Sequence, residues 1–329
     1  MSPEKQRIIR EVEATVSDKL SLLLSVESAW QPCDFLPSFE SETAVEEVMM
    51  LRETARGLPD DLLVVLVGSM VTEEALPSYQ TSLNKLEGIG DETGASGNPW
   101  ATWSRGWTAE ENRHGDLLNR YLYLSGRVDM RAVEVTIQNL IRNGFAPGHG
   151  NDPYKGLIYT SFQERATRIS HSKVGQLARN AGAAALGKIC NAIAGDEARH
   201  EEAYKSFAAE LFKLDPAGAI EAFDAMLTET IVMPAHQMRD GGKVNVFTSF
   251  SMVAQRLGVY TFLDYIDIVE YLIELWDIGH LPGLSGAAAE AQTRICRLPQ
   301  YYRRRSAWMD KKVITQPGIP FRWIQNRVV

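Results

Sequence analysis

A Glu-X-X-His pattern occurs twice in this chain, and it constrains the fold more than any other feature of the sequence. The copies are Glu111–His114 and Glu197–His200. Residues three apart on a helix project from the same face, so each Glu and His can bind one metal ion. A lone glutamate precedes each copy by a similar interval, Glu73 by 38 residues (111 − 73) and Glu164 by 33 residues (197 − 164). The spacing predicts two helix hairpins whose side chains converge on a pair of metal ions.

The residues around each pair extend the likeness between the two copies. Both read acid-Glu-X-Arg-His, over residues 110–114 and 196–200. An isolated Glu-X-X-His is more often a solvated helix face, but two copies in register favour a metal site.

The residue types suit iron best. Carboxylate oxygens and imidazole nitrogens bind iron or manganese, and four glutamates balance the charge of two ferrous ions in a dry core. Asp196 can accept the free imidazole proton of His114 and so select the metal-binding tautomer. Glu110, Arg113 and Arg199 are further candidates for such support; the alternative is that these charged residues form surface ion pairs.

Helical periodicity prevails along the chain and predicts an all-α fold, a ferritin-like bundle with additional helices and a short extended C-terminal tail. We expect one domain over residues 1–329, with a helical core at about 40–280 and a basic segment and tail at about 285–329. The helices are expected at 60–86, from Thr108 onward, and at 130–142, 154–181, 183–211, 217–230 and 260–276. Residues 91–103 and 144–153 are expected to be loops.

Composition narrows the functional classes. A net charge of −8 argues against general affinity for nucleic acid, and no apolar stretch reaches membrane-spanning length. The first residues carry charges where a secretory signal would be apolar. Cys33, Cys190 and Cys296 show no paired spacing, as in proteins of a reducing compartment. We therefore expect a soluble protein of a reducing compartment.

Three segments closely resemble the soluble acyl-carrier-protein desaturases of plastids and some bacteria. They are residues 107–118 (WTAEENRHGDLL), 161–167 (SFQERAT) and 196–200 (DEARH). The likeness extends from about Trp30 through residues 253–260 (VAQRLGVY) to residues 296–299 (CRLP). The resemblance implies a homodimer, two iron ions per chain, reduced ferredoxin as electron donor, and insertion of a cis double bond into a saturated acyl chain, with stearoyl as substrate and carbon 9 as the position. It also implies a location in the bacterial cytoplasm or, without its transit peptide, in the plastid stroma.

The resemblance also implies roles for individual residues. The metal ligands become Glu73, rather than Glu74, with Glu111, His114, Glu164, Glu197 and His200. Thr167 matches a residue on the dioxygen side of the site, and Trp30 and Asp196 match an electron route from the surface to His114. Leu86, Pro147 and Gly156 resemble the deep wall of the acyl cavity. Lys85 stands where relatives usually carry a small polar residue.

An acidic carrier protein would need a local basic patch on this acidic chain. The richest candidate is a run of basic residues: Arg294, Arg297, Arg303, Arg304, Arg305, Lys311 and Lys312. Its alternative reading is a solvated helix face. Two rival functions use the same ligands, a non-enzymatic iron-storage protein and another di-iron enzyme, either a hydroxylase or a radical-generating reductase subunit.

Overall fold

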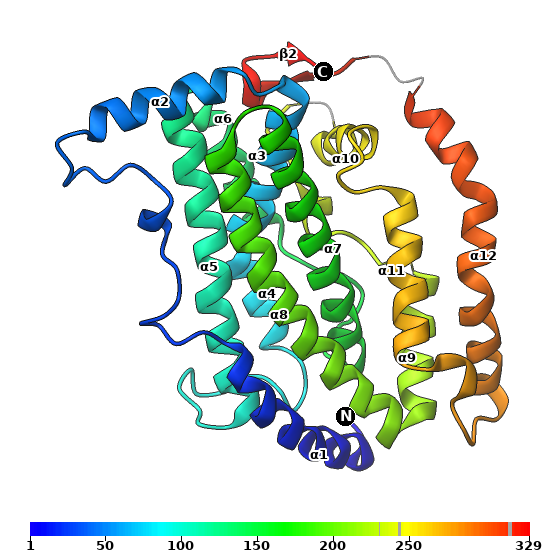
Figure 1. Cartoon of the computed structure of the whole chain (residues 1–329). Coiled ribbons are helices and arrows are strands. Elements are labelled where there is room, and N and C mark those ends of the chain that lie inside the picture. Colours follow the sequence, from blue (N-terminus) through cyan, green and yellow to red (C-terminus); the bar gives the residue numbers. More distant parts are fainter. Residues whose placement is uncertain (230, 243–244, 315–317) are drawn as a thin grey trace.

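The structure, a computed structural model, describes residues 1–229, 231–242, 245–314 and 318–329, with the side chains of 307–314 excepted. In these residues the chain is almost entirely helical (Figure 1). The α-helices are α1 (Pro3–Lys19), α2 (Ala44–Arg56), α3 (Asp60–Glu74), α4 (Leu76–Leu83), α5 (Pro99–Ser125), α6 (Met130–Asn143), α7 (Pro153–Asn180), α8 (Ala184–Leu214), α9 (Pro216–Thr228), α10 (Val246–Arg256), α11 (Phe262–Leu275) and α12 (Gly286–Ile314).

Short elements connect these helices and end the chain. The 3-10 turns are η1 (Leu20–Leu22), η2 (Pro32–Asp34), η3 (Pro234–Gln237), η4 (Ile278–His280) and η5 (Arg322–Ile324). Strands β1 (Pro320–Phe321) and β2 (Arg327–Val328) pair antiparallel, with Pro320 opposite Val328. The expected all-α fold with an extended C-terminal tail is therefore confirmed.

A central bundle of α3, α5, α7 and α8 carries the residues of interest (Figure 1). α7 and α8 form a long hairpin, α9 and α11 lie beside it, and α12 packs on the outside of α9 and α11. α1 crosses one end of the bundle, whereas α2 and the strand pair lie at the other end (Figure 1). The segment that joins α1 to α2 runs along the outside of α5. This segment carries Trp30.

The start of α5 differs from the prediction. The helix begins at Pro99, and the side chain of Asn98 accepts a hydrogen bond from the backbone N–H of Ala101 at 2.7 Å. An asparagine at the N-cap followed by proline at the first helical position is a strong start signal. Thr108, expected to be the cap, lies inside the helix, where its hydroxyl donates to the Ser104 carbonyl at 2.7 Å. His114 therefore sits in the middle of a long helix.

The expected single helix over 60–86 is two helices. α3 ends at Glu74 and α4 starts at Leu76, with a 42° bend between them. Pro77 explains the break, because proline has no N–H and its ring clashes with the carbonyl four residues earlier, that of Glu73. The break ends the helix one residue after Glu73.

The remaining predicted helices agree with α6, α7, α8, α9 and α11 to within a few residues. The helices at both ends of the chain, α1, α2 and α12, and also α10, were not predicted. α12 was interpreted as a basic segment because its charged residues and Pro299 obscure the helical period.

Two apolar clusters fill the ends of the bundle, and the candidate ligands lie between them. On α5, Trp107 belongs to one cluster and Leu117 to the other. On α8, Ile193 and Ala203 flank Glu197 and His200 in the same way. The bundle thus holds a buried polar layer between two dry regions.

In the described ranges, no single helix is both long and apolar enough to span a membrane. Only α3 and α4 taken together, as a bent pair, would pass by length and composition.

Candidate metal centre

The six predicted ligands meet in the polar layer of the bundle. α5 supplies Glu111 and His114, α8 supplies Glu197 and His200, and α3 and α7 each supply one glutamate, Glu73 and Glu164. All six side chains are buried. They form two groups, in each of which one donor atom per residue lies within 4.8 Å of the others: Glu73, Glu111, His114 and Glu197, and Glu111, Glu164, Glu197 and His200.

Glu111 and Glu197 belong to both groups. A carboxylate has two oxygens, so each of these glutamates can bridge a pair of cations. Glu73 and His114 would complete one position, and Glu164 and His200 the other. The arrangement has the form of a dinuclear site with two bridging carboxylates.

Four polar atoms that face this space have no hydrogen-bond partner among the described residues. They are Glu111 Oε1, Glu197 Oε1, His114 Nδ1 and His200 Nδ1. His200 Nδ1 lies 2.7 Å from Glu111 Oε1, but the two atoms lack the geometry of a hydrogen bond. Leaving buried polar atoms unpaired is costly. Their convergence fits a site for metal cations, and the oxygen and nitrogen donors suit iron.

The pKa shifts of the buried carboxyl and imidazole groups also fit a site for metal cations. Burial raises the pKa of Glu73 and of Glu164 above the ordinary value, although His171 and His200 oppose the shift. Burial also acts to raise the pKa of Glu111, but His114 and His200 hold it below its usual range. Burial disfavours charge on the two ligand imidazoles, yet nearby carboxylates raise the pKa of both. The carboxylates thus attract protons that a metal cation would replace.

The outer nitrogen of each ligand histidine contacts an acid from the opposite half of the sequence. His114 Nε2 lies 3.3 Å from Asp196 Oδ2, as predicted. His200 Nε2 lies 3.0 Å from Glu110 Oε2. Both acids are buried, so the surface ion-pair alternative is wrong for them. Each acid holds its imidazole so that Nδ1 faces the other candidate ligands.

Two arginines and a tryptophan complete the support on this side. Arg113 donates to Asp196 Oδ2 at 3.0 Å, and Arg199 donates to Glu110 Oε2 at 2.7 Å. Trp30 donates from Nε1 to Asp196 Oδ1 at 3.2 Å. Its ring stacks on His114 with centroids 6.0 Å apart and an interplanar angle of 13°. Trp30 is only partly buried, so it connects the surface with His114.

Two residues that contact ligand carboxylates were missed from the sequence. Trp107 donates from Nε1 to Glu164 Oε1 at 3.0 Å, and His171 Nε2 lies 2.9 Å from Glu73 Oε1. Trp107 precedes Glu111 by four residues, and His171 follows Glu164 by two helical turns. Helical spacing from a ligand was the signal that could have identified both.

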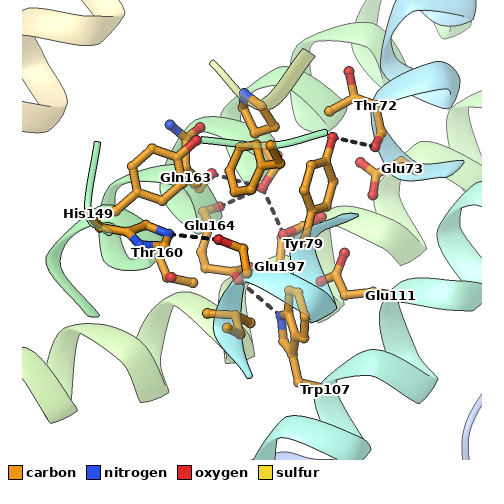
Figure 2. Close-up of a pocket in the computed structure, with 16 residues that line it drawn as sticks. Thr72, Glu73, Tyr79, Trp107, Glu111, His149, Thr160, Gln163, Glu164 and Glu197 are labelled. Carbon is orange, nitrogen blue, oxygen red and sulfur yellow. Dashed lines mark hydrogen bonds between the residues drawn. The ribbon is translucent and has the colours of Figure 1, made fainter. Parts of the chain in front are cut away.

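A cavity adjoins the site on the side of the glutamates. Figure 2 shows Glu73, Glu111, Glu164 and Glu197 at this cavity, with Tyr79, Trp107, His149 and Thr160 among the other lining residues. Thr167 lines it too, and its hydroxyl lies 2.7 Å from Glu197 Oε2.

A second cavity meets the first at four shared lining residues, which are Thr72, Glu73, Thr167 and Pro234. Phe247, Phe250, Ser251 and Tyr260 line the second cavity and are partly exposed. In the first cavity, His149, Tyr159 and Thr160 are buried. The two cavities therefore adjoin each other beside the candidate metal centre, and each is lined by both buried and partly exposed residues.

The three residues predicted to form the deep wall lie outside the lining of both cavities. Leu86 packs on Gly156, so closely that a Cβ at Gly156 would lie 2.4 Å from Leu86 Cδ1. Gly156 is one helical turn before Thr160, which does line the first cavity. Pro147 is buried. Lys85 is exposed and lines a surface groove instead.

Fold and site together define a class: helical bundles with a buried carboxylate–histidine centre for two metal ions. A family model described as fatty acid desaturase matches residues 4–325 of this chain. The acyl-[acyl-carrier-protein] desaturase of Cucumis sativus is 53% identical over 330 residues, which cover 100% of this chain and 83% of that protein. The chain belongs to the acyl-carrier-protein desaturase family and is an oxidoreductase.

Two further relatives and one solved structure are also similar to this chain. The stearoyl-[acyl-carrier-protein] 9-desaturases of Olea europaea and Ricinus communis are each 52% identical over 330 residues, covering 100% of this chain and 85% and 83% of those proteins. The X-ray structure of the putative acyl-ACP desaturase DesA2 from Mycobacterium tuberculosis has a TM-score of 0.53 at 18% identity, covering 84% of this chain and 97% of that one. That last likeness concerns the fold alone.

Proposed function

We propose that this protein inserts a cis double bond into a saturated acyl chain held on acyl carrier protein, with stearoyl as substrate and carbon 9 as the position. The observation that carries the proposal is the position of the carboxylate–histidine centre, beside two adjoining cavities. Membership of the family and the names of the relatives support the choice of substrate. The reaction uses dioxygen, two electrons from reduced ferredoxin and two protons, and releases two water molecules with the alkene.

The six buried donors, Glu73, Glu111, His114, Glu164, Glu197 and His200, would hold two iron ions per chain. Bound there, iron supplies the activation of dioxygen and the oxidising power that removes two hydrogen atoms. The protein positions the metal ligands. Asp196 and Glu110 orient the ligand imidazoles, and Trp107 and His171 hold Glu164 and Glu73.

Placement of the acyl chain follows from the cavities. A saturated chain has no polar group near its middle, so an enclosing apolar channel must select the methylenes that react. In this arrangement the acyl chain would lie in these two cavities, past the candidate metal centre. Thr167 lies where the two cavities meet, and we assign its hydroxyl to the dioxygen side of the site. Leu86, Pro147 and Gly156 would support the wall behind the tail.

Electrons would reach the centre through Trp30 and Asp196. Trp30 is partly exposed, stacks on His114 and is hydrogen-bonded to Asp196. Asp196 in turn contacts the outer nitrogen of His114. These contacts join the protein surface to a candidate ligand of the proposed site.

Carrier protein would dock on the basic face of α12. Arg294 pairs with Asp224, and Arg303 pairs with Asp267 and Glu270, so these two charges are partly neutralised. Arg297 and Arg304 are exposed and remain as candidates, and Arg305 lies over Tyr301. The side chains of Lys311 and Lys312 lie outside the described residues.

The proposal also covers the domain organisation, the oligomeric state and the cellular compartment of the protein. We expect one domain over residues 1–329, because residues from α1 to α12 share one buried cluster. We expect a homodimer, for which the exposed apolar side chains of Met49, Met50 and Tyr123 offer a surface. A bacterial cytoplasm or a plastid stroma provides the carrier protein and ferredoxin, and the plant relatives are named chloroplastic.

A product assay tests the proposal. Iron-loaded protein is incubated with reduced ferredoxin, dioxygen and stearoyl carrier protein, and the released fatty acids are analysed by gas chromatography with mass spectrometry. We expect a mono-unsaturated product with the double bond at carbon 9. A product with only saturated chains would contradict the proposal, and a hydroxylated chain would indicate a hydroxylase instead.

A further inference from the structure

Five buried aromatic side chains lie between α5 and α8, on the side of the candidate metal centre that faces α1. α5 contributes Trp100, Trp103 and Trp107, and α8 contributes Tyr204 and Phe207. On each helix these positions are three or four residues apart, so they share one face. Each of the five side chains is at most 5% exposed. We call these five residues the aromatic row.

The opposite side of the candidate centre has a different composition. There the buried apolar side chains of α5 and α8, two helices that are described in full, are mainly aliphatic, as at Leu117, Leu122, Ile189 and Ile193, with Tyr121 as the aromatic exception. A dry core requires apolar side chains but not indole rings. Packing alone therefore does not explain three tryptophans on one side of the centre.

The inner end of the aromatic row contacts two candidate metal ligands. The indole N–H of Trp107 donates to Glu164 Oε1 at 3.0 Å, and Figure 2 shows this bond. The ring of Trp103 stands nearly perpendicular to that of His200, with centroids 6.4 Å apart. Trp107 also lines the first cavity. An oxidant formed at the centre would therefore have these two indoles beside it.

The row continues outward through ring contacts. Tyr204 packs on both Trp107 and Trp103, with ring centroids 6.3 Å and 5.7 Å away. Phe207 packs on both Trp103 and Trp100, at 5.4 Å from each. The five rings therefore form a continuous series of contacts from the candidate ligands to Trp100.

The outer end of the row lies beside a surface groove. Trp100 donates from Nε1 to the Ile9 carbonyl of α1 at 3.4 Å. Ile9 and Asn98 both line the groove that also contains Lys85. Trp100 thus lies close to the floor of a groove that solvent reaches, whereas Trp107 lies at the candidate centre.

The chemistry of the proposed reaction gives such a row a use. Activation of dioxygen forms a strong oxidant in a buried site, and the protein must exclude competing reactions there. When no acyl chain is in place, the oxidant has to be reduced from another source, because otherwise it attacks nearby side chains. Indole rings give up an electron more readily than aliphatic or phenylalanine side chains, and the radical cation that remains can keep its N–H proton.

We propose that the aromatic row is an electron-transfer route that discharges the centre when dioxygen is activated without a bound acyl chain. The inference rests on the proposed function, and the row is distinct from the route through Trp30. An indole beside the centre loses one electron to it, and the electron vacancy passes outward to Trp100. A one-electron reductant in solution, such as ascorbate or reduced ferredoxin, then returns one electron to Trp100.

The electrons and protons of this reaction balance. Reduction of dioxygen to two water molecules takes four electrons and four protons. In the proposed desaturation, ferredoxin supplies two electrons, solvent supplies two protons, and the acyl chain gives the remaining two of each as two hydrogen atoms. Without the acyl chain, the row supplies its two electrons and solvent supplies its two protons. No covalent bond forms or breaks within the row.

The test locates oxidative damage in the absence of acyl substrate. Iron-loaded proteins are reduced by ferredoxin and exposed to dioxygen in repeated cycles, and oxidised tryptophans are located by peptide mass spectrometry. The double variant W103F/Y204F keeps aromatic rings but leaves no readily oxidised ring in the row between Trp107 and Trp100. The single variant W100F removes the outer end. Trp276→Phe is the matched control, because Trp276 is a similarly buried tryptophan of the same apolar cluster outside the row.

The two row variants should move the damage inward. In wild type we expect oxidation to collect at Trp100, and electron paramagnetic resonance of freeze-quenched samples to show a tryptophan radical. In W103F/Y204F, oxidation of Trp100 should fall to the level of metal-free protein, and oxidation of Trp107 should rise severalfold, because the vacancy no longer passes outward. W100F should show the same rise at Trp107, and the Trp276 variant should match wild type.

The outcomes separate this inference from the function on which it rests. Equal oxidation of Trp107 in wild type and both row variants, or the wild-type pattern in metal-free protein, would overturn the role of the row alone. If the double variant does not fold, W100F decides. The predicted pattern without any unsaturated product from stearoyl carrier protein would overturn the proposed function but not the row. Iron-loaded wild type that consumes no dioxygen would overturn both.

Discussion

Glu110, from the first half of the sequence, holds His200, from the second, with 3.0 Å between Glu110 Oε2 and His200 Nε2. The reciprocal contact joins Asp196 to His114. The acid that precedes each Glu-X-X-His pair therefore serves the histidine of the other pair. This exchange explains why the acid is present in both copies, and it ties α5 to α8 across the proposed centre.

The exchange makes Glu110 a positioning residue with a measurable effect. We expect Glu110→Ala to lower the affinity for ferrous iron by about 10-fold to 100-fold, since the His200 tautomer is no longer selected. Iron titration followed by metal analysis measures this loss. Glu134→Ala, which removes an exposed acid on α6, is the matched control and should bind iron normally. Equal affinity in both variants would refute the role of Glu110.

Removing a metal ligand should reduce iron binding more than removing the acid that orients that ligand. His200 completes only one of the two donor groups, so His200→Ala should lose one iron per chain and keep the other. Circular dichroism should show that the helical fold survives. His280→Ala, at an exposed histidine outside the bundle core, should retain both irons. Two irons bound to the His200 variant would count against the ligand assignment.

If electrons pass through Trp30, a change at this residue should slow steady-state turnover with ferredoxin but leave a single turnover of reduced enzyme unchanged. Trp30→Phe keeps an aromatic ring but removes the N–H that donates to Asp196. Steady-state turnover with ferredoxin should fall by about tenfold, a typical effect of losing such a supporting contact. A single turnover of chemically reduced enzyme should proceed at the wild-type rate. If both rates fell equally, Trp30 would have a structural role instead.

Acid should destabilise the protein partly through His149. Burial lowers the pKa of His149 in the folded state, so the unfolded chain binds more protons. Its contribution to stability is therefore complete above the unfolded pKa of about 6.5 and is lost as pH falls below that value. His149→Asn should weaken the decline of the melting temperature between about pH 6.5 and 5.

An exposed histidine provides the control for this pH effect. The pKa of His280 is raised, because its side chain bonds to Asp277, so its contribution to stability is present at low pH and lost as pH rises. His280→Asn should therefore not weaken the acid decline. Identical pH profiles for wild type and the His149 variant would contradict a buried neutral imidazole.

Metal binding should stabilise the whole fold. Four buried carboxylates and four unpartnered polar atoms are costly without a cation. Iron bound at about 100 times its dissociation constant contributes about 2.7 kcal/mol to stability. We expect a chelator to lower the melting temperature by several degrees, as measured by calorimetry, and iron to restore it. A melting temperature that does not respond to iron would argue against the site.

Much of the centre could be predicted because helical spacing places Glu111 with His114, and Glu197 with His200, on one face whatever the rest of the chain does. The contact between Asp196 and His114 also followed from the pattern. His171 and Trp107 stand at helical spacing from Glu164 and Glu111, but the carboxylates that they contact, Glu73 and Glu164, lie on other helices. Those contacts depend on how α7 packs on α3 and α5, which spacing along one helix does not specify. The start of α5 was misplaced since Thr108 resembles a cap, whereas Asn98 and Pro99 provide it.

The wall of the cavity could not be predicted from the residues alone. The inward position of His149 depends on the left-handed backbone at Gly148 and Gly150 and on its contact with Ser82, which precedes it by 67 residues. A contact between α4 and the loop that joins α6 to α7 forms only when the chain is folded.

The central claim is that six donors from four helices bind two irons. Crystals of the iron-loaded protein, measured at the iron absorption edge, test it most directly. We predict two anomalous peaks in the polar layer, one among Glu73, Glu111, His114 and Glu197 and the other among Glu111, Glu164, Glu197 and His200. A single peak, or iron located away from these side chains, would contradict the account.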